Sequence, residues 1–151
     1  MEFLYETIAA VTWQQVIMWC LGALLIFLAF TAPMLVRKYI ELTFRPETMF
    51  LPVTTAFYAI FPLAAATLVA LARLLRRILR GEVFVSANVA ALRLISYLLY
   101  AAALVFFVAG FFYGPFFILT AAAAFIATVV RVVKNCFDAA VLLKDENELT
   151  I

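Results

Sequence analysis

The chain has 151 residues, of which 69% are hydrophobic and 13% are charged, and its net charge at pH 7 is +2. Ordinary globular domains carry roughly 45–50% apolar residues, and so small a net charge does not indicate direct nucleic-acid binding. The sequence contains no histidine, so it lacks the commonest metal ligand and the usual general base. The composition therefore excludes an ordinary soluble domain and argues against a metal centre, a bound cofactor or direct nucleic-acid binding.

Three long segments of the chain carry no charged residue. They comprise 30 residues between Glu6 and Arg37, 25 between Glu47 and Arg73, and 37 between Arg93 and Arg131. A hydrocarbon core about 30 Å thick is crossed by roughly 20 apolar helical residues. The sequence therefore predicts an all-α integral membrane protein with no separate soluble domain.

The third run is too long for a single span, since a helix of that length would reach about 55 Å. Its middle contains Gly110, Gly114 and Pro115, and a glycine followed by proline is a strong stop signal. We therefore expect two helices joined by a tight turn. The overall prediction is one four-helix transmembrane bundle over residues 1–151, with spans at about 13–36, 52–80, 87–112 and 116–144.

Local signals refine this outline. The apolar residues before the first span predict a short helix lying at the membrane interface. Gly81 is placed to end the second helix, and Ser86 is placed to cap the third. Residues 83–85 and 148–151 are β-prone, so a short β pairing between them on the cytoplasmic side is a further expectation.

Lysine and arginine are unevenly divided between the two sides that four spans define. The N-terminal tail, the 73–93 segment and the C-terminal segment together carry eight, whereas the 37–51 loop carries three and the 110–115 turn none. Positive residues concentrate on the cytoplasmic side of membrane proteins. The count therefore predicts that both termini are cytoplasmic.

Charged residues gather at this predicted cytoplasmic side. Four arginines recur at the helical period at the end of the second helix, and acids cluster at the end of the fourth. The predicted interaction surface comprises Arg73, Arg76, Arg77, Arg80, Arg93, Asp138, Asp145, Glu146 and Glu148. One interpretation is contact with anionic lipid headgroups, another is a clasp in which the arginines hold the acidic tail, and a third is docking of a partner protein.

The second helix also holds a predicted site at lipid depth. Pro62 lacks an N–H and clashes with the carbonyl of Tyr58, so a kink is expected there. The kink would open a gap where Thr54, Thr55 and Tyr58 meet neighbouring helices, suited to a lipid or a small hydrophobic ligand. Simple relief of packing is the alternative interpretation.

The stretch from residue 74 to 99 and the ending DENELTI carry a recognisable pattern. Its matching positions are Arg77, Leu79, Gly81, Phe84, Ser86, Asn88, Val89, Leu92, Arg93, Ile95, Glu148, Leu149 and Thr150. In this pattern the chain resembles the bacterial membrane family catalogued as domain of unknown function 2975, although Val83 replaces the usual proline and Ala87 a frequent acidic residue. The resemblance implies a four-helix protein of the bacterial cytoplasmic membrane, without known chemistry. Because the family's genes are often found beside small helix-turn-helix regulators, it also suggests such a regulator as a partner.

No pattern of side chains in the sequence indicates catalysis. No serine or cysteine lies near an obvious base, and no pair of carboxylates lies within a span. The uncharged spans also disfavour a proton-coupled transporter. We therefore expect a non-enzymatic regulatory or binding module that contacts membrane lipids and, through its charged cytoplasmic face, a cytosolic protein. The alternatives are a small oligomeric transporter or channel, or protection against membrane-active peptides, and the sequence does not indicate the oligomeric state.

Overall fold

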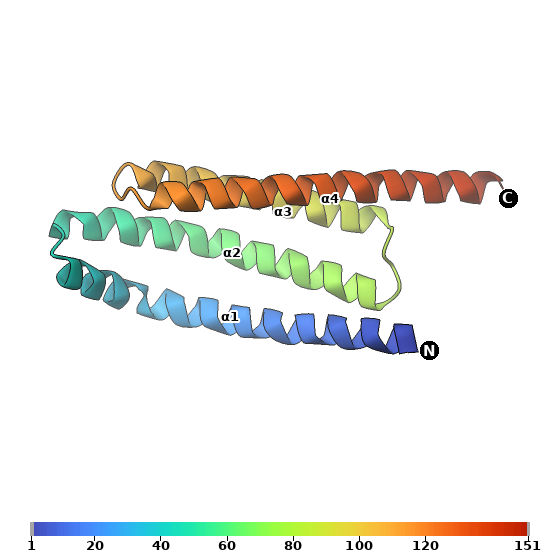
Figure 1. The fold of residues 1–151 in the computed structure, drawn as a ribbon, viewed down its shortest axis with the longest axis horizontal. Helices are drawn as coiled ribbons and strands as arrows, with labels where there is room; N and C mark the ends of the chain where they lie inside the picture. The colour runs from blue at the N-terminus through green and yellow to red at the C-terminus, as the bar shows by residue number, and fades with distance from the viewer. Residues whose placement is uncertain (1, 151) are drawn as a thin grey trace.

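The computed structural model describes residues 2–150 and folds them into four long helices and one short 3₁₀ turn. The helices are α1 (Glu2–Thr43), α2 (Phe50–Leu79), α3 (Ser86–Gly110) and α4 (Phe116–Thr150), with η1 (Glu47–Met49) before α2. Successive helices run antiparallel, so both chain ends and the 80–85 link lie at one end of the molecule, and the other two connections lie at the opposite end (Figure 1). All four helices are long and apolar enough to cross a bilayer. The predicted four-helix fold is confirmed, and the chain is a multi-pass membrane protein.

The helices pack mainly on their neighbours in sequence: α4 lies along α3, α3 along α2, and α2 along α1. Figure 1 shows the result, an array with α1 and α4 on opposite sides. In the most apolar stretch of α1 only 6% of the residues are buried, against 28% in α3. Because lipid tails are as apolar as leucine, the membrane can cover the exposed face of α1.

A proline inside α1 explains one contact between α1 and α2. Pro33 has no N–H, so the carbonyl of Ala29, one turn earlier, has no helical donor. The hydroxyl of Tyr58 on α2 donates a hydrogen bond to this carbonyl at 3.3 Å. In lipid an unsatisfied carbonyl costs several kcal/mol, so the contact satisfies α1 and also fixes its register on α2. Figure 1 shows α1 changing direction in the region that contains Pro33.

α2 ends where the sequence predicts. Gly81 has a φ of +84° and donates its N–H to the carbonyl of Ile78 at 3.0 Å, while Glu82 donates to the carbonyl of Arg77 at 3.0 Å. This pair of bonds is the Schellman motif, which requires a left-handed residue after the helix. The prediction for Ser86 is wrong: Ser86 is the first helical residue, the residue before it is extended, and no side-chain cap bond forms.

α3 and α4 form a hairpin around the predicted glycine–proline break. α3 ends at Gly110 and α4 begins at Phe116. A Cβ added at Gly110 would lie 2.8 Å from the ring of Phe117, so a larger residue would force that ring to move. The hairpin register is marked by a hydrogen bond of 3.1 Å between the hydroxyls of Tyr100 and Thr128.

Two further expectations from the sequence are wrong. α1 is continuous from Glu2, because no glycine or proline interrupts the chain before Gly22, and no separate interfacial helix precedes the span. That expectation rests on the apolar residues Phe3, Leu4, Ile8 and Val11, whose side chains lie outside the described part. The β pairing does not form either: no strand occurs within residues 2–150, and α4 stays helical through Thr150. Extending an existing helix needs no new nucleation, which favours helix at 148–150 over an isolated strand pair.

Candidate functional site

A side chain of α3 holds the 80–85 link. Asn88 is fully buried, and its Nδ2 donates to the carbonyls of Glu82 at 2.8 Å and Val83 at 2.7 Å. Both carbonyls lie outside a helix and need such a donor. The Oδ1 of Asn88 is buried and has no hydrogen-bond partner among the described residues. Asn88 therefore fixes the path of the link between α2 and α3.

The link is also attached to the helices around it. Arg77 of α2 donates to the carbonyl of Ala87 at 3.3 Å. Phe84 packs edge-to-face on Phe137 of α4, with ring centroids 5.6 Å apart. Three further residues of the recognised pattern are buried on α3, namely Val89, Leu92 and Ile95. This part of the pattern thus serves to build the link and the start of α3.

A polar contact joins α3 and α4 further from the link. Ser96 is fully buried, and its hydroxyl accepts a hydrogen bond of 3.3 Å from Nη1 of Arg131. The guanidinium of Arg131 also lies 4.9 Å from the ring centroid of Tyr97, a cation–π contact. The sequence does not reveal these partners of Arg131, because they lie about 35 residues away in the chain.

The predicted interaction residues lie in two groups at the end of the molecule that carries the 80–85 link. Arg73, Arg76 and Arg80 are exposed on the last turns of α2, and Arg93 is exposed on α3. Asp138 is half-buried and follows Phe137, so it lies close to the level of the link. The three other acids, Asp145, Glu146 and Glu148, lie about 12–17 Å further along α4 at 1.5 Å per residue.

α4 is longer than the helix on which it packs. The contact between Phe84 and Phe137 marks the level of the link, and the residues 138–150 continue past it by about 20 Å. We call this segment the α4 overhang. Figure 1 shows it passing beyond the link and beyond the N-terminal end of α1. Leu142 and Leu149 are 61% and 86% exposed on it, and their spacing of seven residues places them on one face.

The residues predicted to line an intramembrane gap all lie on α2. The Tyr58 hydroxyl donates to the carbonyl of Ala29, and Oγ1 of Thr55 donates to the carbonyl of Leu51 at 2.7 Å. Thr54 has a buried Oγ1 without a hydrogen-bond partner in the described structure, and Pro62 lies inside a continuous helix. Thr55 also lines a hollow of about 540 Å³ between α2 and α3. A ligand beside Pro62 stays a prediction.

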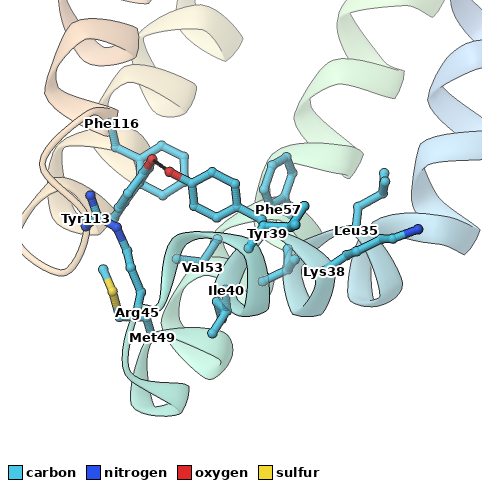
Figure 2. A pocket seen from close by; sticks show the side chains of 12 residues that line it. Leu35, Lys38, Tyr39, Ile40, Arg45, Met49, Val53, Phe57, Tyr113 and Phe116 are labelled. Carbon is cyan, nitrogen blue, oxygen red and sulfur yellow. Dashed lines mark hydrogen bonds between the residues drawn. The ribbon is translucent and has the colours of Figure 1, made fainter.

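A second hollow, of about 490 Å³, lies at the end opposite the overhang, where α1, the 44–49 connection, α2 and the 111–115 turn meet (Figure 2). We call it the α1–α2 pocket. Val36, Ile40, Val53 and Phe57 give it apolar walls, and Lys38 and Arg45 also line it. Phe116 at the start of α4 also lines it, so the walls come from five separate segments, which no local sequence pattern reveals.

Two tyrosines close one side of the α1–α2 pocket. The hydroxyls of Tyr39 and Tyr113 are hydrogen-bonded and the rings meet edge-to-face with centroids 5.9 Å apart, as Figure 2 shows. The guanidinium of Arg45 lies 5.0 Å from the ring centroid of Tyr113. The hydrogen bond to Tyr39, together with burial, raises the pKa of Tyr113 despite the opposing charge of Arg45. The pair joins α1 to the α3–α4 hairpin.

Four apolar helices, a link fixed by Asn88 and a long α4 define a small four-helix multi-pass membrane protein. Residues 41–151 match the family model described as Protein of unknown function (DUF2975). The chain belongs to this family, as the pattern at residues 74–99 suggested. Comparison with curated proteins and with solved structures gives no match. The matched residues include α2, α3, α4 and the last turn of α1.

Proposed function

We propose that this membrane protein is a non-enzymatic binding module whose α4 overhang docks a cytosolic regulatory protein. The observation that carries the proposal is the length of α4. A bilayer is crossed by roughly 20 helical residues, and α4 has 35. The surplus continues past the contact between Phe84 and Phe137, and its residues 142–149 are exposed.

The chemistry of the overhang suits a protein partner. Leu142 and Leu149 expose apolar surface on one face, and Asp145 and Glu148 lie on the same two turns. A helix can offer such a mixed apolar and acidic face to a groove or to a second helix. The neighbouring carboxylates would favour a partner with basic residues at the edge of its docking surface.

A DNA-binding protein of the helix-turn-helix class has this chemistry. Its DNA-contacting surface is rich in lysine and arginine because it neutralises phosphates. If the acidic overhang occupies that surface, the regulator is held at the membrane and kept from DNA. The membrane protein itself would not bind nucleic acid. The family resemblance, which suggests a small regulator of this class as a partner, supports the same choice.

The proposal requires the overhang to face the cytoplasm. The fold groups the eight lysines and arginines of the predicted cytoplasmic side at the end that carries both chain ends (Figure 1). We therefore infer that this end lies on the cytoplasmic side of a bacterial inner membrane. The exposed arginines Arg73, Arg76 and Arg80 would then contact anionic headgroups of the inner leaflet, at about 1 kcal/mol each.

Purification from membranes in a mild detergent tests the proposal. The chain would carry an affinity tag on the N-terminal side, and co-purifying proteins would be identified by mass spectrometry. We expect a small helix-turn-helix protein, and we expect its DNA binding to weaken when the purified membrane protein is added. Reversing two charges of the overhang, in the variant Asp145→Lys with Glu148→Lys, should remove the partner.

The matched control reverses two acids at the opposite end of the molecule, Glu41→Lys with Glu47→Lys. The control should keep the partner, because neither acid lies near the overhang. The proposal fails if both variants retain the same regulator, or if no DNA-binding protein is recovered with the wild-type chain. A pore lined in an oligomer by Thr54, Thr55 and Tyr58 is a weaker alternative, since the hydroxyls of Thr55 and Tyr58 are bonded within the chain and Oγ1 of Thr54 is buried.

A further inference from the structure

We propose that the α1–α2 pocket binds one anionic phospholipid, with an acyl chain in its apolar hollow and the phosphate at Arg45. This goes beyond the docking of a cytosolic protein, because the pocket lies at the opposite end of the molecule and would contact the opposite leaflet. It also stands independently of that docking, since it concerns the purified chain and lipid alone.

The walls of the pocket suit a hydrocarbon chain. Its volume of about 490 Å³ falls in the range of roughly 300–1,000 Å³ that is usual for small-molecule sites. The walls are formed by aliphatic and aromatic side chains, among them Ile40, Val53 and Phe57. Leu42, on the last turn of α1, lines the pocket and is 74% exposed, so it lies at the mouth.

The position of the pocket favours a lipid over a water-soluble ligand. It is built from the last turns of α1, the first turns of α2 and the two connections at that end (Figure 2). In a protein of four spanning helices, these segments lie where the hydrocarbon core meets the headgroups. An acyl chain can therefore enter from the membrane while its headgroup stays at the surface.

The charges of the pocket select an anionic headgroup. Lys38 and Arg45 belong to its lining, and none of its lining residues carries a carboxylate. Figure 2 shows the two cations on different sides of the hollow, with Arg45 beside Tyr113 and Lys38 directed away from the tyrosine pair. A guanidinium matches the geometry of a phosphate. We therefore assign the phosphate to Arg45, with Lys38 adding to the positive potential.

Photolabelling of the full chain in vesicles tests this assignment. The vesicles would consist of phosphatidylcholine with a trace of either phosphatidylglycerol or phosphatidylcholine that carries a photoreactive group on one acyl chain. The labelled peptides would be identified by mass spectrometry. We expect phosphatidylglycerol to label the peptides that contain Ile40, Val53 or Phe57 more strongly than phosphatidylcholine does.

Three variants sharpen the result. Arg45→Gln should lower phosphatidylglycerol labelling of the pocket about fivefold, the factor that corresponds to one lost cation at a membrane surface, and Lys38→Gln should lower it less. Leu42→Trp should fill the mouth and reduce labelling by both lipids. Its control is Ile118→Trp, because Ile118 is also 74% exposed but does not line the pocket.

The assignment is overturned if the two lipids label these peptides equally, or if Arg45→Gln leaves phosphatidylglycerol labelling unchanged. It is also overturned if Leu42→Trp labels as strongly as Ile118→Trp. None of these results depends on a cytosolic partner, so failure here is distinguishable from failure of the docking proposal.

Discussion

At the scale of single residues, Asn88 carries the largest predicted effect on stability. Replacing it with alanine leaves the carbonyls of Glu82 and Val83 without their donor inside the protein. We expect Asn88→Ala to lower the free energy of unfolding in mixed micelles by about 2–4 kcal/mol, and to speed proteolysis within the link. The control Ser86→Ala should change stability by less than about 0.5 kcal/mol, since Ser86 is exposed and makes no cap bond. Equal effects of the two variants would contradict the role of Asn88.

Tyr58 provides a test of coupling between two helices. Tyr58→Phe removes the donor for the Ala29 carbonyl and should cost about 1 kcal/mol. In a Pro33→Ala background the cost should fall, because residue 33 then supplies a helical N–H to the same carbonyl. Unfolding of all four chains of this double-mutant cycle measures the coupling. A Tyr58→Phe cost that is the same with and without Pro33 would show that the hydroxyl does not compensate for the proline.

Tyr113 gives a prediction about pH. Its folded-state pKa lies above the ordinary value of 10.0, chiefly because of the hydrogen bond to Tyr39. The folded state therefore holds this proton more tightly than the unfolded state. The resulting contribution of Tyr113 to the free energy of unfolding is fully present below pH 10 and is lost as the pH rises through the raised pKa. Tyr39→Phe should shift phenolate absorbance of the folded protein to lower pH. Tyr5→Phe, which removes an exposed tyrosine, is the control and should leave the remaining titration unchanged.

The sequence was informative about individual residues only where the signal is local. Gly81 ends α2 because the left-handed conformation of a helix stop favours glycine, and this could be predicted. Asn88 could not, because an asparagine three residues into a helix has no pattern that reveals bonds to the preceding link. Ser86 is the more conventional cap in the sequence, yet it is the first helical residue, and the carbonyl of Val85 accepts from the N–H groups of Asn88 and Val89.

At the scale of elements, the overhang and the clasp make opposite predictions. The clasp requires the arginines to hold one or more of four acids; Asp138 lies close to the level of the link, but Asp145, Glu146 and Glu148 lie about 12–17 Å past it. We expect the overhang to be helical as a continuation of α4, so replacing the three acids with alanine should leave its protease resistance in membranes unchanged. A marked rise in cleavage would show that the arginines hold the acids, and would count against their role in docking.

The ends of the helices show how far the sequence specifies elements. The break at Gly114 and Pro115 was predictable because glycine and proline there combine with a run too long for one span. The extent of α4 was not, since its last residues are individually β-prone, yet they continue an existing helix. The bend in α1 has a local signal in Pro33, but its compensation by Tyr58 depends on a contact with a residue 29 positions away in the chain.

At the scale of the whole molecule, the order of packing was beyond the reach of sequence. Spans that are apolar on every side do not reveal which face meets a neighbour, so neither the array of α1 to α4 nor the α1–α2 pocket could be predicted. Helix number and the grouping of charges could be, because both depend on length and composition alone.

Orientation is the prediction that belongs to the whole molecule. With Cys20 and Cys136 replaced by serine, single cysteines would be placed at Glu82 and Thr43 and exposed to an impermeant thiol reagent in whole cells. We expect the cysteine at 43 to react and that at 82 to be protected, because eight of the eleven lysines and arginines lie on the side of the link. Glu82 is used because Gly81 has a positive φ. Reaction at 82 alone would reverse the topology.

The central claim is that the α4 overhang contacts a cytosolic regulator, and site-specific photo-crosslinking in living cells tests it most directly. A photoreactive amino acid at Leu149 should form an adduct with a helix-turn-helix protein, and the adduct should disappear with Asp145→Lys and Glu148→Lys. The same group at Leu104, which is 64% exposed within the span of α3, should give lipid adducts and no such protein. Only lipid adducts from Leu149, or a protein adduct that survives the charge reversal, would contradict the account.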